Sequence, residues 1–176
     1  MKKILKISLT AVMLFSMFLS AGCFAGDSAS KTEKGKFPAF SAKDLNGNAV
    51  TNEIFKGKKV TVINIWGTFC PPCIGEMPEL GAWDKEMPKD AQIIGIVCDA
   101  KNEKDKKTAD AAVKILESSN AKFINLLPSE EIMKYLETVD AVPTTIFVDS
   151  EGNILGSPVI GADVPKYKER LAGYLK

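Results

Sequence analysis

Short apolar runs alternate along this chain with longer segments whose apolar residues recur at helical spacing. The short runs are rich in Val, Ile and Phe, as strands covered on both faces are. They lie at residues 59–66, 91–98, 123–127 and 144–149. Segments with one apolar side, typical of amphipathic helices, lie at 71–86, 104–119 and 162–176. A further short helix is expected after Ser129, which is a favourable N-cap residue.

Turn signals show which strands pair as hairpins. Asn46-Gly47 divides the segment from Phe37 to Val50, and this dipeptide tolerates positive φ, so an N-terminal hairpin is expected. Ser150-Glu151-Gly152 separates the run at 144–149 from a predicted antiparallel partner at 153–159. Alternating strands and helices that end in a hairpin and a helix predict an α/β fold, with helices on both faces of a central mixed sheet. No internal repeat interrupts residues 37–176, which are predicted to form one domain.

The first 22 residues have the pattern of an export signal. Lys2, Lys3 and Lys6 precede an apolar stretch from Ile7 to Leu19, and small residues follow up to Gly22. This order predicts a cleaved signal peptide over residues 1–22, and an uncleaved N-terminal anchor is the alternative.

Cys23 directly follows the small residues that end this signal. The sequence Leu19-Ser20-Ala21-Gly22-Cys23 resembles a bacterial lipobox, although Ser20 stands where a branched apolar residue is usual. Lipidation of Cys23 is therefore predicted, with plain secretion as the alternative. Residues 23–36 contain Gly, Ser and Lys and are interpreted as a flexible tether.

Composition restricts the chemistry. The 176 residues carry a formal net charge of +1, which gives no reason to expect a nucleic-acid partner. The chain contains no histidine, so Ser–His and Cys–His catalysis, histidine metal ligation and axial histidine binding to haem are excluded. No metal or cofactor is expected, and proton transfer must use a carboxylate, a lysine, a thiol or water.

Cys70-Pro71-Pro72-Cys73 lies where a predicted buried strand passes into a helix. The N-terminus of a helix carries a partial positive charge and free N–H groups, which stabilise a thiolate. Cys70 is therefore the expected nucleophile, and Cys73 is close enough in sequence to resolve the mixed disulfide. Pro71 and Pro72 stiffen the turn at positions where an N–H would have no helical partner.

Three other interpretations of the cysteine pair compete with a redox-active pair. A structural zinc site needs four ligands, and Cys98 alone could join the pair. An inert structural disulfide would close a very small loop and so would remove little entropy from the unfolded chain. A reduced pair with a purely structural role is not expected outside the cytosol. All three are disfavoured relative to a redox-active pair.

Two sequence blocks together resemble a known family. The first runs from Val62 to Cys73 and continues through Glu76-Met77-Pro78-Glu79-Leu80, and the second is Ala141-Val142-Pro143-Thr144-Thr145-Ile146-Phe147. They resemble the active-site blocks of extracytoplasmic thioredoxins of the TlpA/ResA type and of the reductant of cytochrome c maturation. The resemblance implies a thioredoxin fold with an N-terminal β-hairpin extension.

The resemblance also implies roles for residues around the pair. Pro143 would follow a cis peptide bond and lie against the cysteines, and Val142 would offer its backbone to an extended substrate; a trans turn proline is the alternative. Trp66 and Phe69 occupy positions where the family places aromatic residues, although core burial also accounts for Trp66.

Cytoplasmic thioredoxins carry a buried aspartate six residues before the first cysteine, and this chain has Asn64 there. Glu76 lies one helical turn after Cys73 and matches a family glutamate, so it is the candidate acceptor of the Cys73 proton. A solvated helix glutamate is the alternative. Cys98 ends a neighbouring strand, where it is either a small buried apolar residue or a third redox group.

The direction of the reaction is predicted to be reductive. Pro71-Pro72 offers neither charge nor a side-chain donor to a thiolate, and strong oxidants stabilise their thiolate heavily. The expected partners are an extracytoplasmic protein disulfide and a membrane electron donor of the CcdA/DsbD type, which a lipid on Cys23 would bring close to a monomeric domain. A thiol peroxidase, a copper-delivery module or a purely binding role on the same fold are the alternatives, and the peroxidase and copper signatures are incomplete here.

Overall fold

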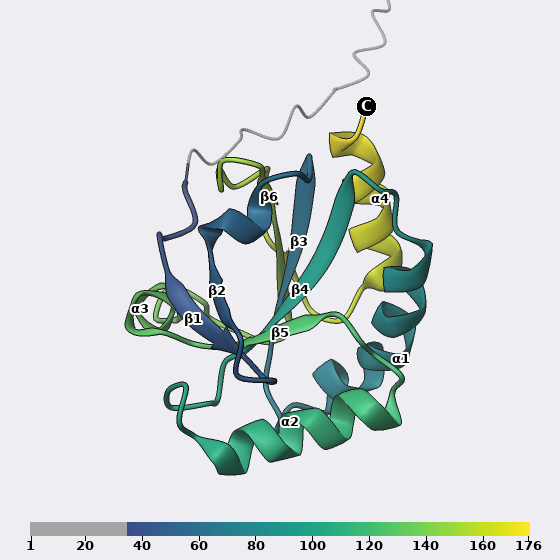
Figure 1. The fold of residues 1–176 in the computed structure, drawn as a ribbon. Coiled ribbons are helices and arrows are strands. Elements are labelled where there is room, and N and C mark those ends of the chain that lie inside the picture. The colour runs from purple at the N-terminus through teal and green to yellow at the C-terminus, as the bar shows by residue number, and fades with distance from the viewer. Residues whose placement is uncertain (1–34) are drawn as a thin grey trace, which may run out of the picture.

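The computed structural model describes residues 35–176, which form a seven-stranded sheet and four α-helices (Figure 1). The strands are β1 (Ser41–Asp44), β2 (Ala49–Thr51), β3 (Val60–Trp66), β4 (Ala91–Val97), β5 (Ile124–Leu127), β6 (Thr144–Asp149) and β7 (Val159–Ile160). The helices are α1 (Pro71–Glu86), α2 (Lys106–Ser118), α3 (Glu130–Leu136) and α4 (Val164–Tyr174), and a 3-10 turn, η1, spans Asn52–Phe55.

The sheet is mixed, as predicted, with the strand order β2-β1-β5-β4-β3-β6-β7. Its centre is β3, which pairs in parallel with β4 and antiparallel with β6. The cysteine pair follows directly after β3, and the strand that begins after Pro143 is β6. The two sequence blocks therefore meet because their strands are neighbours.

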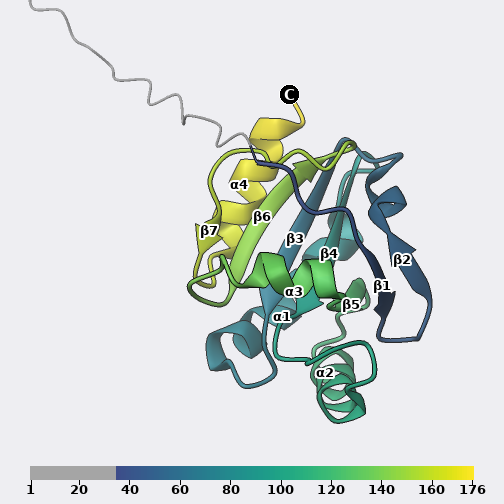
Figure 2. The ribbon, with the colours of Figure 1, turned by 90° about the vertical axis from the view of Figure 1, so that its left-hand side faces the viewer.

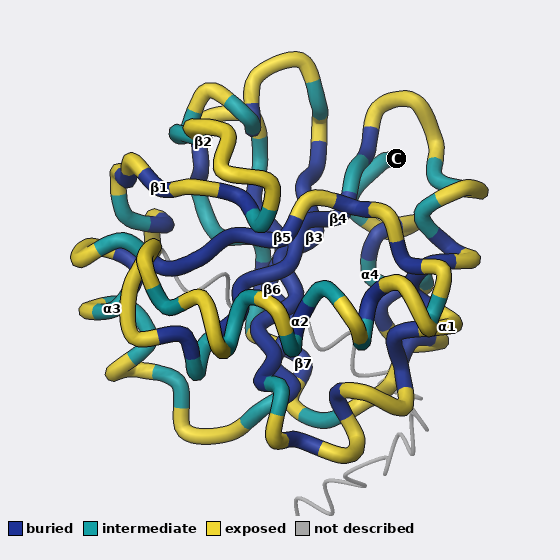
Figure 3. The backbone as a smooth tube through the Cα atoms, turned by 60° about the horizontal axis from the view of Figure 1, so that its bottom comes forward, coloured by how far each residue is buried: buried dark blue, intermediate teal, exposed yellow. Residues whose placement is uncertain are grey.

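Residues of β3 alternate between the two faces of the sheet. Val62 and Trp66 pack with residues of α1, α2 and α4, whereas Ile63 and Ile65 pack with α3 and the N-terminal segment. In Figure 1, α1 and α4 lie to the right of the sheet and α3 to the left, and Figure 2 shows α3 in front of the strands. All seven residues of β3 are buried, which accounts for the β-branched run in the sequence (Figure 3).

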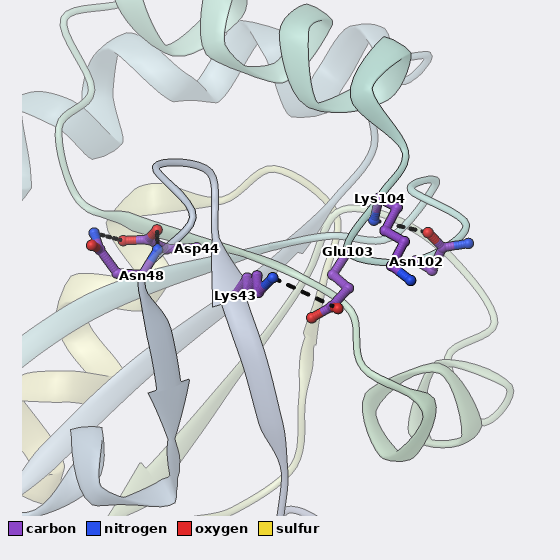
Figure 4. Close-up of polar contacts among 6 residues, drawn as sticks. All are labelled: Lys43, Asp44, Asn48, Asn102, Glu103 and Lys104. Atoms are coloured by element: carbon purple, nitrogen blue, oxygen red, sulfur yellow. Dashed lines mark hydrogen bonds and ion pairs between the residues drawn. The ribbon is translucent and has the colours of Figure 1, made fainter.

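The N-terminal hairpin is closed by one carboxylate. Asp44 accepts hydrogen bonds from the backbone N–H of Asn46 at 2.9 Å and of Asn48 at 2.8 Å, and Gly47 takes a φ of +85°. The Asn48 side chain also donates to Asp44, and Lys43 reaches Glu103 at 3.8 Å, which ties the hairpin to the loop before α2 (Figure 4). In the same loop the Asn102 side chain accepts from the backbone N–H of Lys104.

The turn after β6 repeats this arrangement. Asp149 accepts from the N–H groups of Glu151 and Asn153, each at 2.9 Å, and Gly152 has a φ of +80°. Both turns have the sequence Asp-x-x-Gly-Asn, in which the carboxylate replaces the missing partners of the turn backbone.

The predicted strand at 153–159 is wrong in part. Only Ile154 bridges to Val148, and regular pairing resumes at β7. Gly156, with a φ of +67°, and Pro158, which has no N–H, interrupt the ladder between them. Gly35, the first described residue, lies beside Ile154, and its carbonyl accepts the N–H of Ile154.

Other boundaries shift by at most four residues, the largest shift being that of the N-terminal hairpin, whose first strand begins at Ser41 and not at Phe37. One capping detail also differs. Ser129 does precede α3, but its hydroxyl donates to the Glu131 carboxylate at 2.7 Å instead of capping the helix backbone. The predicted signal peptide, Cys23 and the tether up to residue 34 lie outside the described residues. None of the helices within residues 35–176 is both long and apolar enough to cross a bilayer.

Candidate active site

Cys70 and Cys73 form a disulfide at the N-terminus of α1, with their Cα atoms 5.3 Å apart. Cys70 is the N-cap of the helix, and its Sγ accepts the backbone N–H of Cys73 at 3.3 Å. Pro71 and Pro72 occupy the first two helical positions and have no N–H to offer. The Cys70 sulfur therefore receives the partial charge of the helix end and one direct N–H donor.

The loop between β3 and the cysteines is held by Asp99. The carboxylate of Asp99 accepts the backbone N–H of Thr68 at 3.0 Å and the Thr68 hydroxyl at 2.6 Å. Gly67 has no side chain, and the Phe69 ring occupies the space that a Cβ would take. Thus Asp99 fixes the approach to the pair, and Gly67 lets Phe69 fold back over the loop.

The Val142–Pro143 peptide bond is cis, and it lies beside the disulfide. The carbonyl oxygen of Val142 is 3.6 Å from Cys70 Sγ. On its other side, Pro143 accepts the N–H of Gly161 at 2.8 Å, which joins this segment to the residue that follows β7. The main chain of Val142 thus lies next to the more accessible sulfur.

The two sulfurs differ in their exposure to a partner. Cys73 is fully buried, whereas Cys70 retains 5% of its surface. Around Cys70, Pro71 and Pro72 are exposed, and the Phe69 side chain is 67% exposed. A large partner can therefore reach Cys70 but not Cys73.

Glu76 is buried one turn of α1 beyond Cys73. Its Oε1 accepts the Asn64 side-chain N–H at 2.8 Å, and its Oε2 lies 3.0 Å from the Tyr167 hydroxyl. Asn64 also donates to the Thr145 hydroxyl at 3.1 Å. These four residues come from α1, β3, β6 and α4, so the fold assembles them from distant parts of the chain.

Burial raises the pKa of Glu76 from 4.5 to about 7. The hydrogen bonds from Asn64 and Tyr167 oppose this rise, and the nearby Glu79 carboxylate adds to it. Burial also raises the pKa of Tyr167 to about 12, so its hydroxyl keeps its proton at neutral pH. Glu76 is thus a buried carboxyl group with a pKa near neutrality, one helical turn after Cys73.

Asn64 carries an unusual feature in this otherwise satisfied network. Its Oδ1 is the one buried side-chain nitrogen or oxygen within residues 35–176 that lacks a hydrogen-bond partner. Both donor hydrogens of Asn64 are used, one on Glu76 and one on Thr145. The amide is thus oriented to donate to the carboxyl group, which favours the ionised form of Glu76.

Trp66 lies in the same apolar cluster as the cysteines and is fully buried. Its indole N–H donates to the Asn125 side chain at 2.8 Å, and Asn125 in turn donates to the Phe123 carbonyl. A side chain at Gly95 would collide with Asn125. Trp66 is therefore held by β4 and β5 as well as by α1.

Cys98 lies on the other side of the sheet. It packs with the cluster beneath α3, whereas Cys70 and Cys73 belong to the cluster beneath α1. Burial, with the neighbouring Asp99 carboxylate, raises the pKa of the Cys98 thiol to about 11. A thiol with this pKa is protonated and unreactive at neutral pH.

Sequence reasoning did not identify Asp99, Thr145 or Tyr167 as part of the site. A signal existed for Tyr167, because a tyrosine on the apolar side of a helix needs a partner for its hydroxyl. Thr145 and Asp99 had no comparable signal. Among residues 35–176, no three or more cysteine and carboxylate side chains gather as metal ligands would.

Comparison with known proteins agrees with this geometry. The Redoxin family model matches residues 32–171. The thiol-disulfide oxidoreductase ResA of Bacillus anthracis is 31% identical over 141 residues, which cover 79% of this chain and 74% of the relative. The thiol:disulfide interchange protein DsbE of Vibrio cholerae is 30% identical, over 97% of this chain and 92% of the relative.

A solved structure also supports the architecture. The thioredoxin domain of a thiol-disulfide oxidoreductase from Bacteroides vulgatus superposes with a TM-score of 0.61 at 27% identity, covering 78% of this chain and 96% of that one. The expected thioredoxin fold is thereby confirmed. With a disulfide at the start of α1 and matches over most of its length, the chain belongs to the Redoxin family.

Proposed function

We propose that this protein is a thiol–disulfide oxidoreductase that reduces protein disulfides outside the cytoplasm through Cys70 and Cys73. The observation that carries the proposal is the placement of the disulfide. Its accessible sulfur caps a helix beside the Val142 carbonyl, and its second sulfur is buried one turn before a carboxyl group. Relatives named as thiol-disulfide oxidoreductases support the same class of reaction.

The reaction takes two exchanges. In the reduced protein the Cys70 thiolate attacks one sulfur of the substrate disulfide, forms a mixed disulfide and releases the first substrate thiolate. The Cys73 thiolate then attacks Cys70 Sγ, which restores the Cys70–Cys73 disulfide and releases the second substrate thiolate. The two cysteines lose two electrons, and the substrate disulfide gains them.

Glu76 serves the second exchange in this proposal. Cys73 is buried, so its thiol loses its proton to a neighbouring group more readily than to water. Glu76 lies at i+3 on the same helix, on the same face, and its raised pKa of about 7 allows it to accept that proton and release it again. The products of this step are the Cys73 thiolate and a neutral Glu76 carboxyl.

The small number of hydrogen-bond donors to Cys70 Sγ supports the reductive direction. It has one N–H donor, from Cys73, because Pro71 and Pro72 supply none. A weakly stabilised thiolate favours the disulfide form of the protein and so makes the dithiol a reductant. Val142 offers its backbone, and the exposed ring of Phe69 offers an apolar contact, to an extended segment of the substrate protein.

Location and partners complete the proposal. Residues 1–22 export the domain, and a lipid on Cys23 holds it at the membrane. The tether that follows is shorter than the predicted 23–36, because Gly35 and Lys36 pair with Ile154 and Asn153 of the domain. A membrane electron donor of the CcdA/DsbD type then returns two electrons to the Cys70–Cys73 disulfide. Metabolic labelling with a fatty acid, compared between the wild type and Cys23→Ala, tests the anchor; equal labelling contradicts it.

Insulin reduction by dithiothreitol tests the activity. The wild type is expected to accelerate the reaction and Cys70→Ser to abolish the acceleration, with Cys98→Ser as the matched control that retains it. Redox titration tests the direction, for which a potential near that of thioredoxin, about −270 mV, is expected. A potential near −120 mV, as in a strong oxidant, would contradict the reductase assignment.

A further inference from the structure

The hydroxyl group of Tyr167 has more hydrogen-bond acceptors than it can serve. Its oxygen lies 2.6 Å from the Gly161 carbonyl oxygen and 3.0 Å from Glu76 Oε2, and it accepts the backbone N–H of Asp163 at 3.3 Å. A tyrosine hydroxyl has a single hydrogen and two lone pairs. It can therefore donate to Gly161 or to Glu76, but not to both at once.

The protonation state of Glu76 decides between these two arrangements. When Glu76 is neutral with its hydrogen on Oε2, it donates to Tyr167, and Tyr167 donates to the Gly161 carbonyl. In this arrangement Glu76 Oε2, the Tyr167 hydroxyl and the Gly161 carbonyl each have a hydrogen-bond partner. When Glu76 is ionised it can only accept, so the Tyr167 hydrogen turns to Oε2, and the Gly161 carbonyl loses its donor.

Gly161 connects this choice to the chain beside the disulfide. Its N–H donates to the Pro143 carbonyl at 2.8 Å, and the preceding residue, Ile160, pairs with Thr144. The carbonyl oxygen of Val142, one residue before Pro143, lies 3.6 Å from Cys70 Sγ. The Gly161 carbonyl is therefore only one peptide unit away from the Gly161 N–H, which donates a hydrogen bond to the Val142–Pro143 segment beside the disulfide.

We propose that Tyr167 is a positioning residue whose hydroxyl hydrogen moves between Glu76 and the Gly161 carbonyl as Glu76 loses and gains its proton, so that the Val142–Pro143 segment responds to the state of Glu76. The proposal rests on the role of Glu76 proposed above. In this proposal the proton that Cys73 releases has two effects. It neutralises Glu76, and it thereby allows the Tyr167 hydroxyl to donate to the Gly161 carbonyl again.

The other groups around Glu76 do not offer an alternative switch. Asn64 from β3 and Thr145 from β6 are neutral at every relevant pH. Glu79 on α1 is paired with Lys168 of α4 at 3.3 Å at the surface. The Asp163 carboxylate caps α4 by accepting the N–H of Lys166 at 3.1 Å. Cys73 is held in the disulfide in the oxidised protein and does not titrate.

The test is a carbon-detected NMR titration of the oxidised full-length protein. The carboxyl carbon of Glu76 is expected to titrate near pH 7, and the Gly161 carbonyl carbon is expected to follow with the same midpoint. In Glu76→Gln the Gly161 response should disappear. This comparison needs no change at Tyr167, so it stands even if variants of that residue fold poorly.

Tyr167→Phe removes the hydroxyl and keeps the buried ring. The Gly161 carbonyl should then lose its response, and the Glu76 midpoint should rise by about one pH unit, as expected when an ionised carboxylate loses one donor. Tyr174→Phe makes the same change on the same helix, where the hydroxyl contacts Arg170, and should leave both titrations unaltered.

The outcomes separate this proposal from the one it rests on. A Gly161 carbonyl that ignores Glu76 in the wild type, or that still follows it in Tyr167→Phe, overturns the role of Tyr167. If Gly161 follows Glu76 but Glu76→Gln leaves the reactivity of Cys73 unchanged, the switch stands and the proton transfer proposed for Glu76 fails.

Discussion

Even-numbered residues of β3 face α1 and α4, and odd-numbered residues face α3, so one strand contributes to two different interiors. On the first side lie Asn64 and Trp66, each with a hydrogen-bonded side chain, together with the disulfide. On the second side Ile63 and Ile65 pack against other apolar residues, and the Cys98 sulfur packs against the same cluster.

The two faces of the sheet differ in the polar side chains that they bury. Buried polar groups are costly unless they are paired, and the hydrogen-bonded group of Asn64, Glu76 and Thr145 lies on the side that carries the redox-active helix end. The side beneath α3 has aromatic edge-to-face packing, as between Phe37 and Phe55, and supports the sheet. We therefore expect the Cys70 sulfur to be reactive and the Cys98 sulfur to be unreactive because their surroundings differ.

Among changes on the side of the disulfide, Glu76→Gln is expected to have the largest effect. A general base contributes about 100-fold or more, so resolution of the mixed disulfide by Cys73 should slow by about that factor at pH 7.5. In the wild type the rate should rise with pH through about 7, as Glu76 becomes ionised, and the variant should lack this step. Quenched-flow trapping of the mixed disulfide measures it.

Glu79→Gln is the matched control for this prediction. Glu79 lies three residues further along α1, where it is exposed and paired with Lys168. Its loss should change the rate by less than about twofold, as expected for an exposed pair. Equal slowing in both variants would assign the effect to charge in general rather than to the buried carboxyl.

The same carboxyl should make stability depend on pH. The pKa of Glu76 is raised from 4.5 to about 7 in the folded protein, so its contribution is fully present below pH 4.5 and is lost as the pH rises to 7. The free energy of unfolding should fall by roughly 3 kcal/mol across this window. Urea unfolding of the oxidised protein at pH 4.5 and 7.5 measures the change, and Glu76→Gln should lose most of it. A variant that keeps the full dependence would point to other carboxyls.

How far the sequence could predict the site depends on how local each contact is. The helix start, the cysteine pair and the place of Glu76 one turn after Cys73 follow from spacing within one segment, but spacing left open whether the Glu76 side chain is buried. Tyr167 reaches Glu76 across 91 positions in the sequence, and Thr145 reaches Asn64 across 81, so neither contact has a local pattern. The strand predicted at 153–159 is too long because its apolar residues favour a strand, whereas Gly156 and Pro158 interrupt the pairing with β6.

A smaller effect is expected from Trp66→Phe, which leaves the Asn125 oxygen buried without its donor. Loss of one partner of a buried hydrogen bond costs about 1–3 kcal/mol of unfolding free energy. Urea unfolding of Trp66→Phe, Asn125→Ala and the double variant forms a cycle that isolates the pair. Strictly additive losses would show that Trp66 stabilises the protein through packing alone.

The smallest effect is expected on the opposite side of the sheet, from Cys98→Ala. The Cys98 thiol has a pKa of about 11 and packs beneath α3, away from the cluster that holds the disulfide. Insulin reduction should therefore change by less than about twofold, and unfolding free energy by about 1 kcal/mol or less, as for a small truncation at a half-buried position.

The order in which the thiols react tests the same contrast. Iodoacetamide labelling of the reduced wild type at pH 7.5 should modify Cys70 first and Cys98 last, because the rate of labelling follows the thiolate fraction of each cysteine and its accessibility. Rapid labelling of Cys98, or a disulfide linking it to Cys70 or Cys73, would mean that the sheet does not separate the two kinds of sulfur, and the contrast between the faces would fail.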